Sequence, residues 1–252
     1  MDTAKKFTHK YHPSPRLSAN QLADYLSAGP TARKTILRDA KFPPTMLLIR
    51  YEDARAALKQ HLTGKADALV HALQALHHKS GGGSILSDYA KTNCLLCIDA
   101  IEGFQAAEKN MKAAGVVFSL PLLYTTRLKI SGVSVSVSVD LMTEKTDAKG
   151  QKSVGAAMLI FAKPAKKAND VADRCKSSAM LIHELLKSQI KPIAGLDPTL
   201  CMAIDVFNGT IYRAKSHQKI LYKNVENSCS EVATVWPTIE PPANYNGPPI
   251  PK

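Results

Sequence analysis

The chain has 252 residues, 45% hydrophobic and 21% charged, a composition that allows a buried core without disulfides and excludes extensive disorder. Its apolar runs are far shorter than the roughly 20 residues of a membrane helix. The N-terminus lacks the apolar segment of a secretory signal, so we predict no membrane partner and a cytoplasmic location. The net charge of +12 favours a polyanionic partner, with nucleic acid ahead of an anionic membrane surface.

Residues 1–80 are predicted to form an N-terminal helical region. Ser18 is an N-cap candidate for a helix that ends at Gly29-Pro30. A short basic helix follows from Thr31, and apolar residues at three- and four-residue spacing predict helices over 51–62 and 66–79. The sequence KSGGGS, residues 79–84, then predicts a flexible connection.

Residues 84–236 are predicted to form a second region with mixed α and β structure. A long helix is expected over 87–113, followed by three strands at 122–130, 133–142 and 153–162. After Pro164 the pattern predicts a helix over 166–188, a hairpin turning at Asn208-Gly209, and a last helix over 223–236. The proline-rich tail, residues 237–252, is expected to be extended, and its sequence does not choose between folding back, docking on a partner and remaining unordered.

The stretch SGVSVSVSVDLMTE, residues 131–144, alternates valine and serine through four repeats before Asp140. Side chains alternate between the two faces of a strand, so a single strand here would place the valines on one face. Ser134, Ser136, Ser138 and Asp140 would then share the other face. The valine face can be buried, and the small serine face allows another surface to approach closely.

The order helix, three strands, helix, strand over about residues 87–214 resembles the αβββαβ core of the PD-(D/E)XK nuclease superfamily. The resemblance implies a restriction-endonuclease-like α/β fold (α+β) and hydrolysis of phosphodiester bonds with Mg²⁺ or Mn²⁺. It also implies an acid on the second strand, a Glu/Asp-x-Lys on the third, and an additional Glu on the first helix. The matching catalytic residues are Asp140 as a metal ligand, Glu102 as a second metal ligand or a base that orients water, and Lys163 as the cation that positions water. The chain departs from the pattern at Phe161, which stands where the second acid is expected.

This departure leaves three interpretations open. The protein is a metal-dependent nuclease, an inactive nuclease-fold subunit that binds nucleic acid or a nuclease partner, or a protein-interaction module. Asp140 by itself is equally compatible with a residue that only ends a strand and starts a turn.

Two groups of basic residues are candidate phosphate contacts. One group is on the short basic helix, and the other lies beside Lys163. DNA is favoured over RNA as the target. A protein partner in a larger complex is also predicted. The predicted nucleic-acid-binding residues are Arg33, Lys34, Arg38, Lys41, Lys166 and Lys167.

Overall fold

The computed structural model describes residues 7–46, 50–83, 86–121, 127–162, 168–189 and 195–251. The protein has mixed α and β structure and divides into two units, neither of which is continuous in sequence. Unit 1 consists of residues 1–48, 126–137 and 218–252, and unit 2 of residues 49–125 and 138–217. These units do not follow the predicted ranges, because the N-terminal helices are shared between them and the tail belongs to unit 1.

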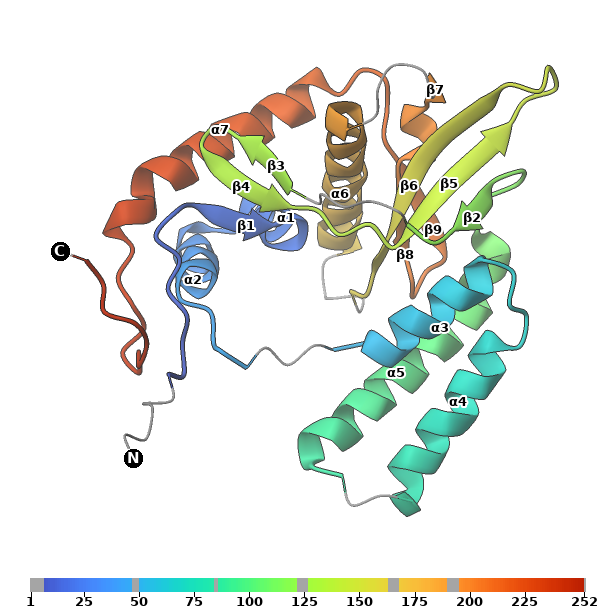
Figure 1. Ribbon diagram of the computed structural model, residues 1–252, viewed down its shortest axis with the longest axis horizontal. Helices are drawn as coiled ribbons and strands as arrows, with labels where there is room; N and C mark the ends of the chain where they lie inside the picture. The colour runs from blue at the N-terminus through green and yellow to red at the C-terminus, as the bar shows by residue number, and fades with distance from the viewer. Residues whose placement is uncertain are drawn as a thin grey trace. The chain divides into compact units, whose positions relative to one another are not determined.

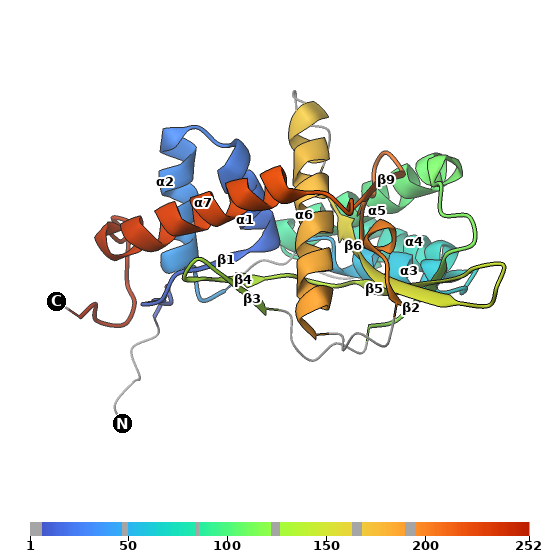
Figure 2. The same ribbon diagram turned by 90° about the horizontal axis from the view of Figure 1, so that it is seen from above.

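In unit 1, helices pack on a small sheet (Figure 1). Its elements are β1 (Arg16–Ser18), α1 (Ala19–Ser27), α2 (Pro30–Lys41), β3 (Arg127–Ile130), β4 (Val133–Ser136), α7 (Lys219–Val235) and a 3-10 turn (Trp236–Thr238). The strand order is β1-β4-β3, with β1 parallel and β3 antiparallel to β4. Helices α1 and α7 pack against each other and against β4, and Figure 2 shows them with α2.

Ser18 is the N-cap of α1, as predicted. Its hydroxyl accepts from the Gln21 amide at 3.1 Å, and the Gln21 side chain accepts from the Ser18 amide at 2.9 Å. This reciprocal capping box satisfies two backbone donors that the first turn of a helix leaves free. The hydrogen bonds that start this helix are therefore made between residues three positions apart in the sequence.

The proline-rich tail folds back on unit 1, which decides between the three possibilities that its sequence left open. The Lys41 ammonium donates to the carbonyls of Trp236, Pro237 and Ile239 at 2.8, 3.2 and 2.9 Å. Further along, the Tyr245 ring packs edge-on against Phe42, with 5.2 Å between ring centroids. The tail is thus part of the unit and completes its hydrogen bonding.

In unit 2, helices lie on both faces of a larger sheet. Its helices are α3 (Glu52–Leu62), α4 (Ala68–His78), α5 (Asp88–Ala107) and α6 (Ala168–Gln189), with a π-helical turn (Lys79–Gly83) and 3-10 turns (Glu108–Asn110, Pro198–Leu200). Its strands are β2 (Val117–Ser119), β5 (Leu141–Thr146), β6 (Lys152–Ile160), β7 (Gly195–Leu196), β8 (Met202–Asp205) and β9 (Thr210–Arg213). None of the helices in the described ranges is both long and apolar enough to cross a membrane.

The main sheet of unit 2 has the strand order β2-β5-β6-β8-β9, with β7 paired to β6. Strands β6 and β8 are parallel, whereas β2-β5, β5-β6 and β8-β9 are antiparallel. The predicted hairpin is β8-β9, and Gly209 supplies the positive φ of 61° that its turn requires. The glycine-rich residues 79–83 form a π-helical turn, although their composition predicted a flexible connection.

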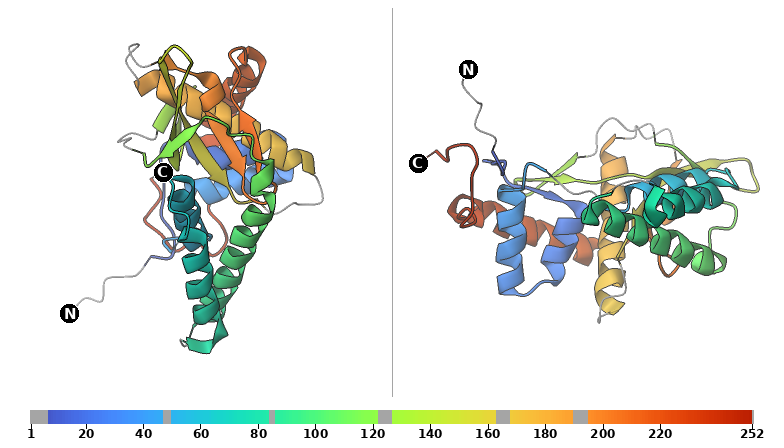
Figure 3. Two further views of the ribbon diagram at one scale, coloured as in Figure 1. Left: turned by 90° about the vertical axis from the view of Figure 1, so that its right-hand side faces the viewer. Right: turned by 90° about the horizontal axis from the view of Figure 1, so that it is seen from below.

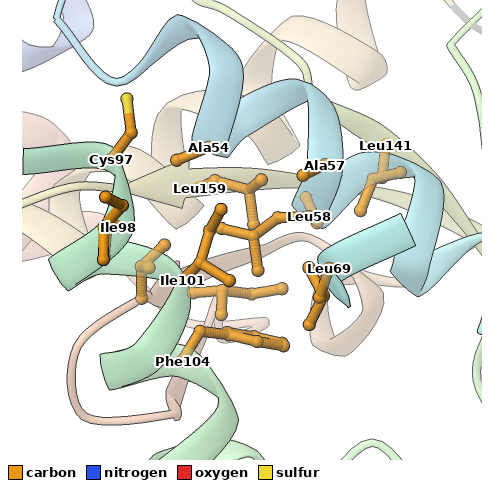
Figure 4. Close-up of a cluster of buried hydrophobic side chains, with 14 of the residues drawn as sticks. Ala54, Ala57, Leu58, Leu69, Cys97, Ile98, Ile101, Phe104, Leu141 and Leu159 are labelled. Carbon is orange, nitrogen blue, oxygen red and sulfur yellow. The ribbon is translucent and has the colours of Figure 1, made fainter. Parts of the chain in front are cut away.

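Helices α3, α4 and α5 cover one face of this sheet, and Figure 3 (left) shows α4 and α5 side by side. Their apolar stripes meet alternate strand residues such as Leu141, Leu159 and Ile204, all of which are fully buried (Figure 4). The intervening residues, including Met158 and Ala203, point to the other face, where α6 packs against β6, β8 and β9. This unit therefore has three layers with the sheet in the middle.

The alternating stretch is not one strand, which corrects the sequence prediction. Residues 133–136 form β4 and pair with β1 and β3 of unit 1, whereas 141–146 form β5 and pair with β2 and β6 of unit 2. The valine face is confirmed for Val133, Val135 and Val137, which are fully buried. Asp140 precedes β5 and is buried, so it does not share an exposed face with Ser134 and Ser136.

Three short strands, β1, β2 and β7, were not predicted. They have two or three residues, too few for alternation to be recognised in the sequence. The predicted strand over 122–130 lies partly outside the described residues, and its described end, β3, pairs in unit 1. The edge position next to β5 is taken by β2 instead.

Candidate functional site

Asp140 is held against the backbone of β6. Its amide donates to the Ala157 carbonyl at 2.9 Å, and its Oδ2 accepts from the Leu159 amide at 2.8 Å. Antiparallel pairing puts the start of β5 beside the end of β6, which explains why a residue just before β5 reaches Leu159. The Asp140 side chain is only 6% exposed, so its charge requires a partner.

That partner is Arg55, which projects from α3. Its guanidinium donates to Asp140 Oδ2 at 2.5 Å and is 34% exposed. The same guanidinium lies over the Phe161 ring at 4.8 Å from the centroid. A charge-assisted hydrogen bond and a cation–π contact therefore fix Arg55 at the end of β6.

Phe161 also stacks on Tyr51, with 5.1 Å between ring centroids. Tyr51 precedes α3 in the left-handed backbone region, with φ of 63°, and its amide donates to the Asn93 side chain at 3.2 Å. A non-glycine residue in this region is strained and persists only where its surroundings hold it. Phe161, at the position of the expected acid, is thus part of an aromatic contact that holds α3 against the sheet.

These residues do not fit the predicted magnesium or manganese site. Asp140 Oδ2 already accepts two hydrogen bonds, one from a cation that would repel a metal ion. Glu102, the second predicted ligand, is exposed on α5. Among the residues that the structure describes, no three or more His, Cys, Asp or Glu side chains are grouped so that they could hold a metal.

A second buried acid, Asp205, was not predicted from the sequence. It lies at the same end of the sheet as Asp140. It ends β8, opposite Ile160 of β6, and is 2% exposed. Its carboxylate accepts from the amides of Phe207 and Asn208 at 3.1 and 3.3 Å and from the Asn208 side chain at 2.7 Å. The position of an Asp three residues before Asn208 is a signal of this turn, and the carboxylate stabilises the hairpin.

Of the predicted cationic residues next to this site, Lys163, Lys166 and Lys167 lie outside the described residues. The other four are on α2, in unit 1. Arg33 pairs with Glu231 at 3.5 Å and lies over the Tyr25 ring at 4.8 Å from its centroid. Arg38 approaches Asp39 at 3.6 Å, and Lys34 is exposed.

Lys41 has a structural position that the sequence did not reveal. The residue is 3% exposed, and burial lowers the pKa of its ammonium. Its three hydrogen bonds to the carbonyls of Trp236, Pro237 and Ile239 use all three donors of an ammonium group, which leaves none for a phosphate. In unit 1, Lys41 therefore binds backbone carbonyls and has no donor left for the predicted contact with nucleic acid.

The pocket beside α2 has a volume of about 740 Å³ and a mixed charge. Arg33, Lys34 and Arg38 line it together with the carboxylates of Glu231 and Glu240. These acids reduce the positive potential that a phosphate would meet. The basic helix is consequently a weaker phosphate site than its sequence predicted.

The buried cysteines do not form disulfides. Cys94 and Cys97 lie in α5, both buried and free. Burial raises the pKa of the Cys97 thiol, and this favours the neutral, unreactive form.

No family model matches the chain, and no curated protein matches its sequence.

Proposed function

We propose that this protein binds nucleic acid through its phosphates and does not hydrolyse it. The net positive charge supports a polyanionic ligand, since the chain has 33 Lys and Arg residues and only 21 Asp and Glu residues. The proposal corresponds to an inactive nuclease-fold protein rather than to a metal-dependent nuclease. The absence of hydrolysis rests on one observation, the pairing of Asp140 with Arg55.

The order of elements in unit 2 supports the resemblance to the PD-(D/E)XK core. Reading α5, β2, β5, β6, α6 and β8 along the chain gives αβββαβ, and the strands follow one another across the sheet in the order β2-β5-β6-β8. The strands that carry this order differ from the predicted ones, because β3 and β4 belong to the other unit. The segment between β2 and β5 would then be an insertion into the core.

The Asp140–Arg55 pair argues against hydrolysis. For Asp140 to bind a metal, Arg55 would have to leave a carboxylate that is 6% exposed and lose its contact with Phe161. Losing a hydrogen bond between charged groups typically costs about 1.5–3 kcal/mol. Phe161 supplies no oxygen to offset this cost, since it stacks on Tyr51.

The binding test uses labelled single-stranded DNA, duplex DNA and RNA, with fluorescence anisotropy at rising salt. Phosphate recognition by about five cations predicts that log Kobs falls with log salt with a slope of about −4. A higher affinity for DNA than for RNA would match the preference expected from the sequence. Absent or salt-independent binding would overturn the proposal and leave a protein partner as the remaining interpretation.

The cleavage test uses plasmid DNA and RNA with Mg²⁺ or Mn²⁺. We expect no cleavage by the wild-type protein, and no difference between it, Asp140→Asn, Glu102→Ala and Lys163→Ala. Cleavage by the wild type that is lost in Asp140→Asn and Lys163→Ala would establish a nuclease instead. Circular dichroism of each variant ensures that a loss of activity is not a loss of folding.

A further inference from the structure

The small sheet of unit 1 presents a row of basic side chains on one face. In the register of the sheet, Arg16 and Lys129 flank Ser134, and Arg127 pairs with Ser136. Residues paired across neighbouring strands project to the same side of a sheet. These five residues therefore share one face, here called the basic face.

The opposite face of the same sheet is closed by packing. Leu17, Leu128, Val133 and Val135 alternate with the basic-face residues and are buried. On the basic face, Arg127 and Lys129 are exposed, while Arg16 and both serines are half-buried. The sheet thus separates an apolar side that is used for folding from a polar side that faces solvent.

A pocket of about 180 Å³ lies at this sheet. His12, Arg16, Arg127 and Ser134 line it together with the Pro13–Pro15 segment, and its lining includes no carboxylate. Burial lowers the pKa of His12, and the charges of Arg16, Lys10 and Arg127 lower it further. The cations around the pocket are therefore close enough for their fields to overlap at the His12 ring.

The segment that forms the pocket wall is anchored on both sides. The Pro15 carbonyl accepts from the Ser134 amide at 3.0 Å, and the His12 carbonyl accepts from the Trp236 indole at 3.1 Å. The His12 amide donates to the Lys41 carbonyl at 2.9 Å. A wall held in this way presents the pocket before a ligand arrives, which reduces the ordering that binding requires.

Within the described part of the chain, the cations of the basic face have no anionic partner in an ion pair. Among the ion pairs between residues that the structure describes, none includes Arg16, Arg127 or Lys129. This distinguishes them from Arg33 on α2, which pairs with Glu231. Two guanidinium groups and a serine hydroxyl around one small pocket provide donors that match the oxygens of a phosphate group.

We propose that the basic face binds the phosphodiester backbone of nucleic acid, with one phosphate in the pocket between Arg16 and Arg127. Neighbouring strands are about 4.8 Å apart, so the strands of Arg16 and Lys129 stand about 10 Å apart across β4. Long cationic side chains at that separation can reach a backbone from both sides, and the small Ser134 and Ser136 between them leave room for it. This inference rests on the proposed function and adds the site that performs it.

The test compares anisotropy titrations of labelled DNA with the wild type, Arg16→Ala, Arg127→Ala and the double variant. Each lost phosphate contact should reduce the salt slope by about 1, and the double variant should bind about tenfold more weakly at moderate salt. Ser134→Asp places a negative charge on the floor of the pocket and should weaken binding at least as much. Ser134→Ala, which keeps the size of the side chain, should remain close to the wild type.

Lys219→Ala is the matched control, since it removes an exposed cation of unit 1 from α7, the helix that contacts β3 and β4. Its affinity should stay within about twofold of the wild type. Fluorescence of Trp236, the single tryptophan, checks that each variant keeps the fold of unit 1.

The outcomes separate the site from the function. If the wild type does not bind nucleic acid, the proposed function fails. If it binds with a steep salt dependence that Arg16→Ala, Arg127→Ala and Ser134→Asp leave unchanged, the function stands and the basic face is overturned. Competition with inorganic phosphate and binding to phosphatidylserine vesicles are measured alongside. Vesicle binding that falls in the variants while DNA binding does not would assign the face to a membrane surface and overturn the proposal.

Discussion

Charged residues are treated in opposite ways in the two units. In unit 2, Asp140 is buried and its charge is neutralised by Arg55 and the Leu159 amide. In unit 1, Arg16 and Arg127 border a pocket without a carboxylate in its lining. A charge that is paired inside the fold stabilises it, whereas a cation without an ion pair among the described residues can bind an anionic ligand.

The same stretch of sequence supplies both arrangements. Ser134 and Ser136 lie in β4 of unit 1, and Asp140, only four residues after Ser136, lies directly before β5 in unit 2. The chemistry suggested by the acid and the chemistry suggested by the serines therefore belong to different sheets.

The largest effect is expected for Arg55→Ala. It leaves the buried Asp140 carboxylate with only the Leu159 amide as a partner and removes the contact with Phe161. We expect the free energy of unfolding to fall by about 3 kcal/mol, measured by urea denaturation with circular dichroism. Gln60→Ala, at an exposed position of the same helix, is the control and should change stability by less than about 0.5 kcal/mol. If Arg55→Ala were as neutral as the control, the pair would not be structural and Asp140 would again be open to a ligand.

A smaller effect is expected for Lys41→Met, which tests the buried cation of unit 1. The change keeps an unbranched side chain but leaves the carbonyls of Trp236, Pro237 and Ile239 without their donor. Because buried acceptors without a donor are destabilising, we expect the free energy of unfolding to fall by about 2 kcal/mol. Trp236 fluorescence measures this unfolding, since the Trp236 carbonyl is one of the acceptors. Arg16→Ala should leave the same transition nearly unchanged. Equal effects of the two variants would contradict the distinction between a structural and a ligand-binding cation.

The smallest effect concerns alkaline pH and the buried thiols of unit 2. Burial raises the pKa of Cys201 to about 12, against 9.0 for a free thiol, with the nearby carboxylates of Asp197 and Glu184 adding to the shift. The folded state therefore retains a proton that the unfolded state loses, and stability falls as the pH rises from 9 towards 12. Cys201→Ala should be about 1 kcal/mol less stable at pH 7 and should lose stability less steeply above pH 9. Urea unfolding at several pH values measures how the free energy of unfolding changes with pH. The control variant Gln60→Ala should show the same pH dependence as the wild type. If Cys201→Ala also showed it, the Cys201 thiol would not be the source of the pH dependence.

Local sequence signals predicted much of the secondary structure. The Ser18 cap starts α1, and Asn208-Gly209 turns the β8-β9 hairpin, because both depend on contacts within a few residues. The serine–valine alternation predicted which residues of β4 would be buried, since side chains on a strand alternate between its faces.

The candidate site was less accessible, because its contacts join residues far apart in the sequence. Asp140 and Arg55 are separated by 85 positions, and Arg55 carried no signal of pairing. Lys41 illustrates the same limit, since its acceptors begin 195 residues later in the tail. Composition identified these cations but could not distinguish a buried one from an exposed one.

The sequence by itself determined the helices, the hairpin, the two-faced character of the alternating stretch and the excess of positive charge. The tertiary structure decided that residues 133–136 and 141–146 join different sheets, that Phe161 packs with Arg55 and Tyr51, and that Arg16 and Arg127 line one pocket. The physical reason is that strand pairing and ion pairing are made between distant segments. A residue's type specifies what it can bind, but only the folded chain specifies which partner it meets.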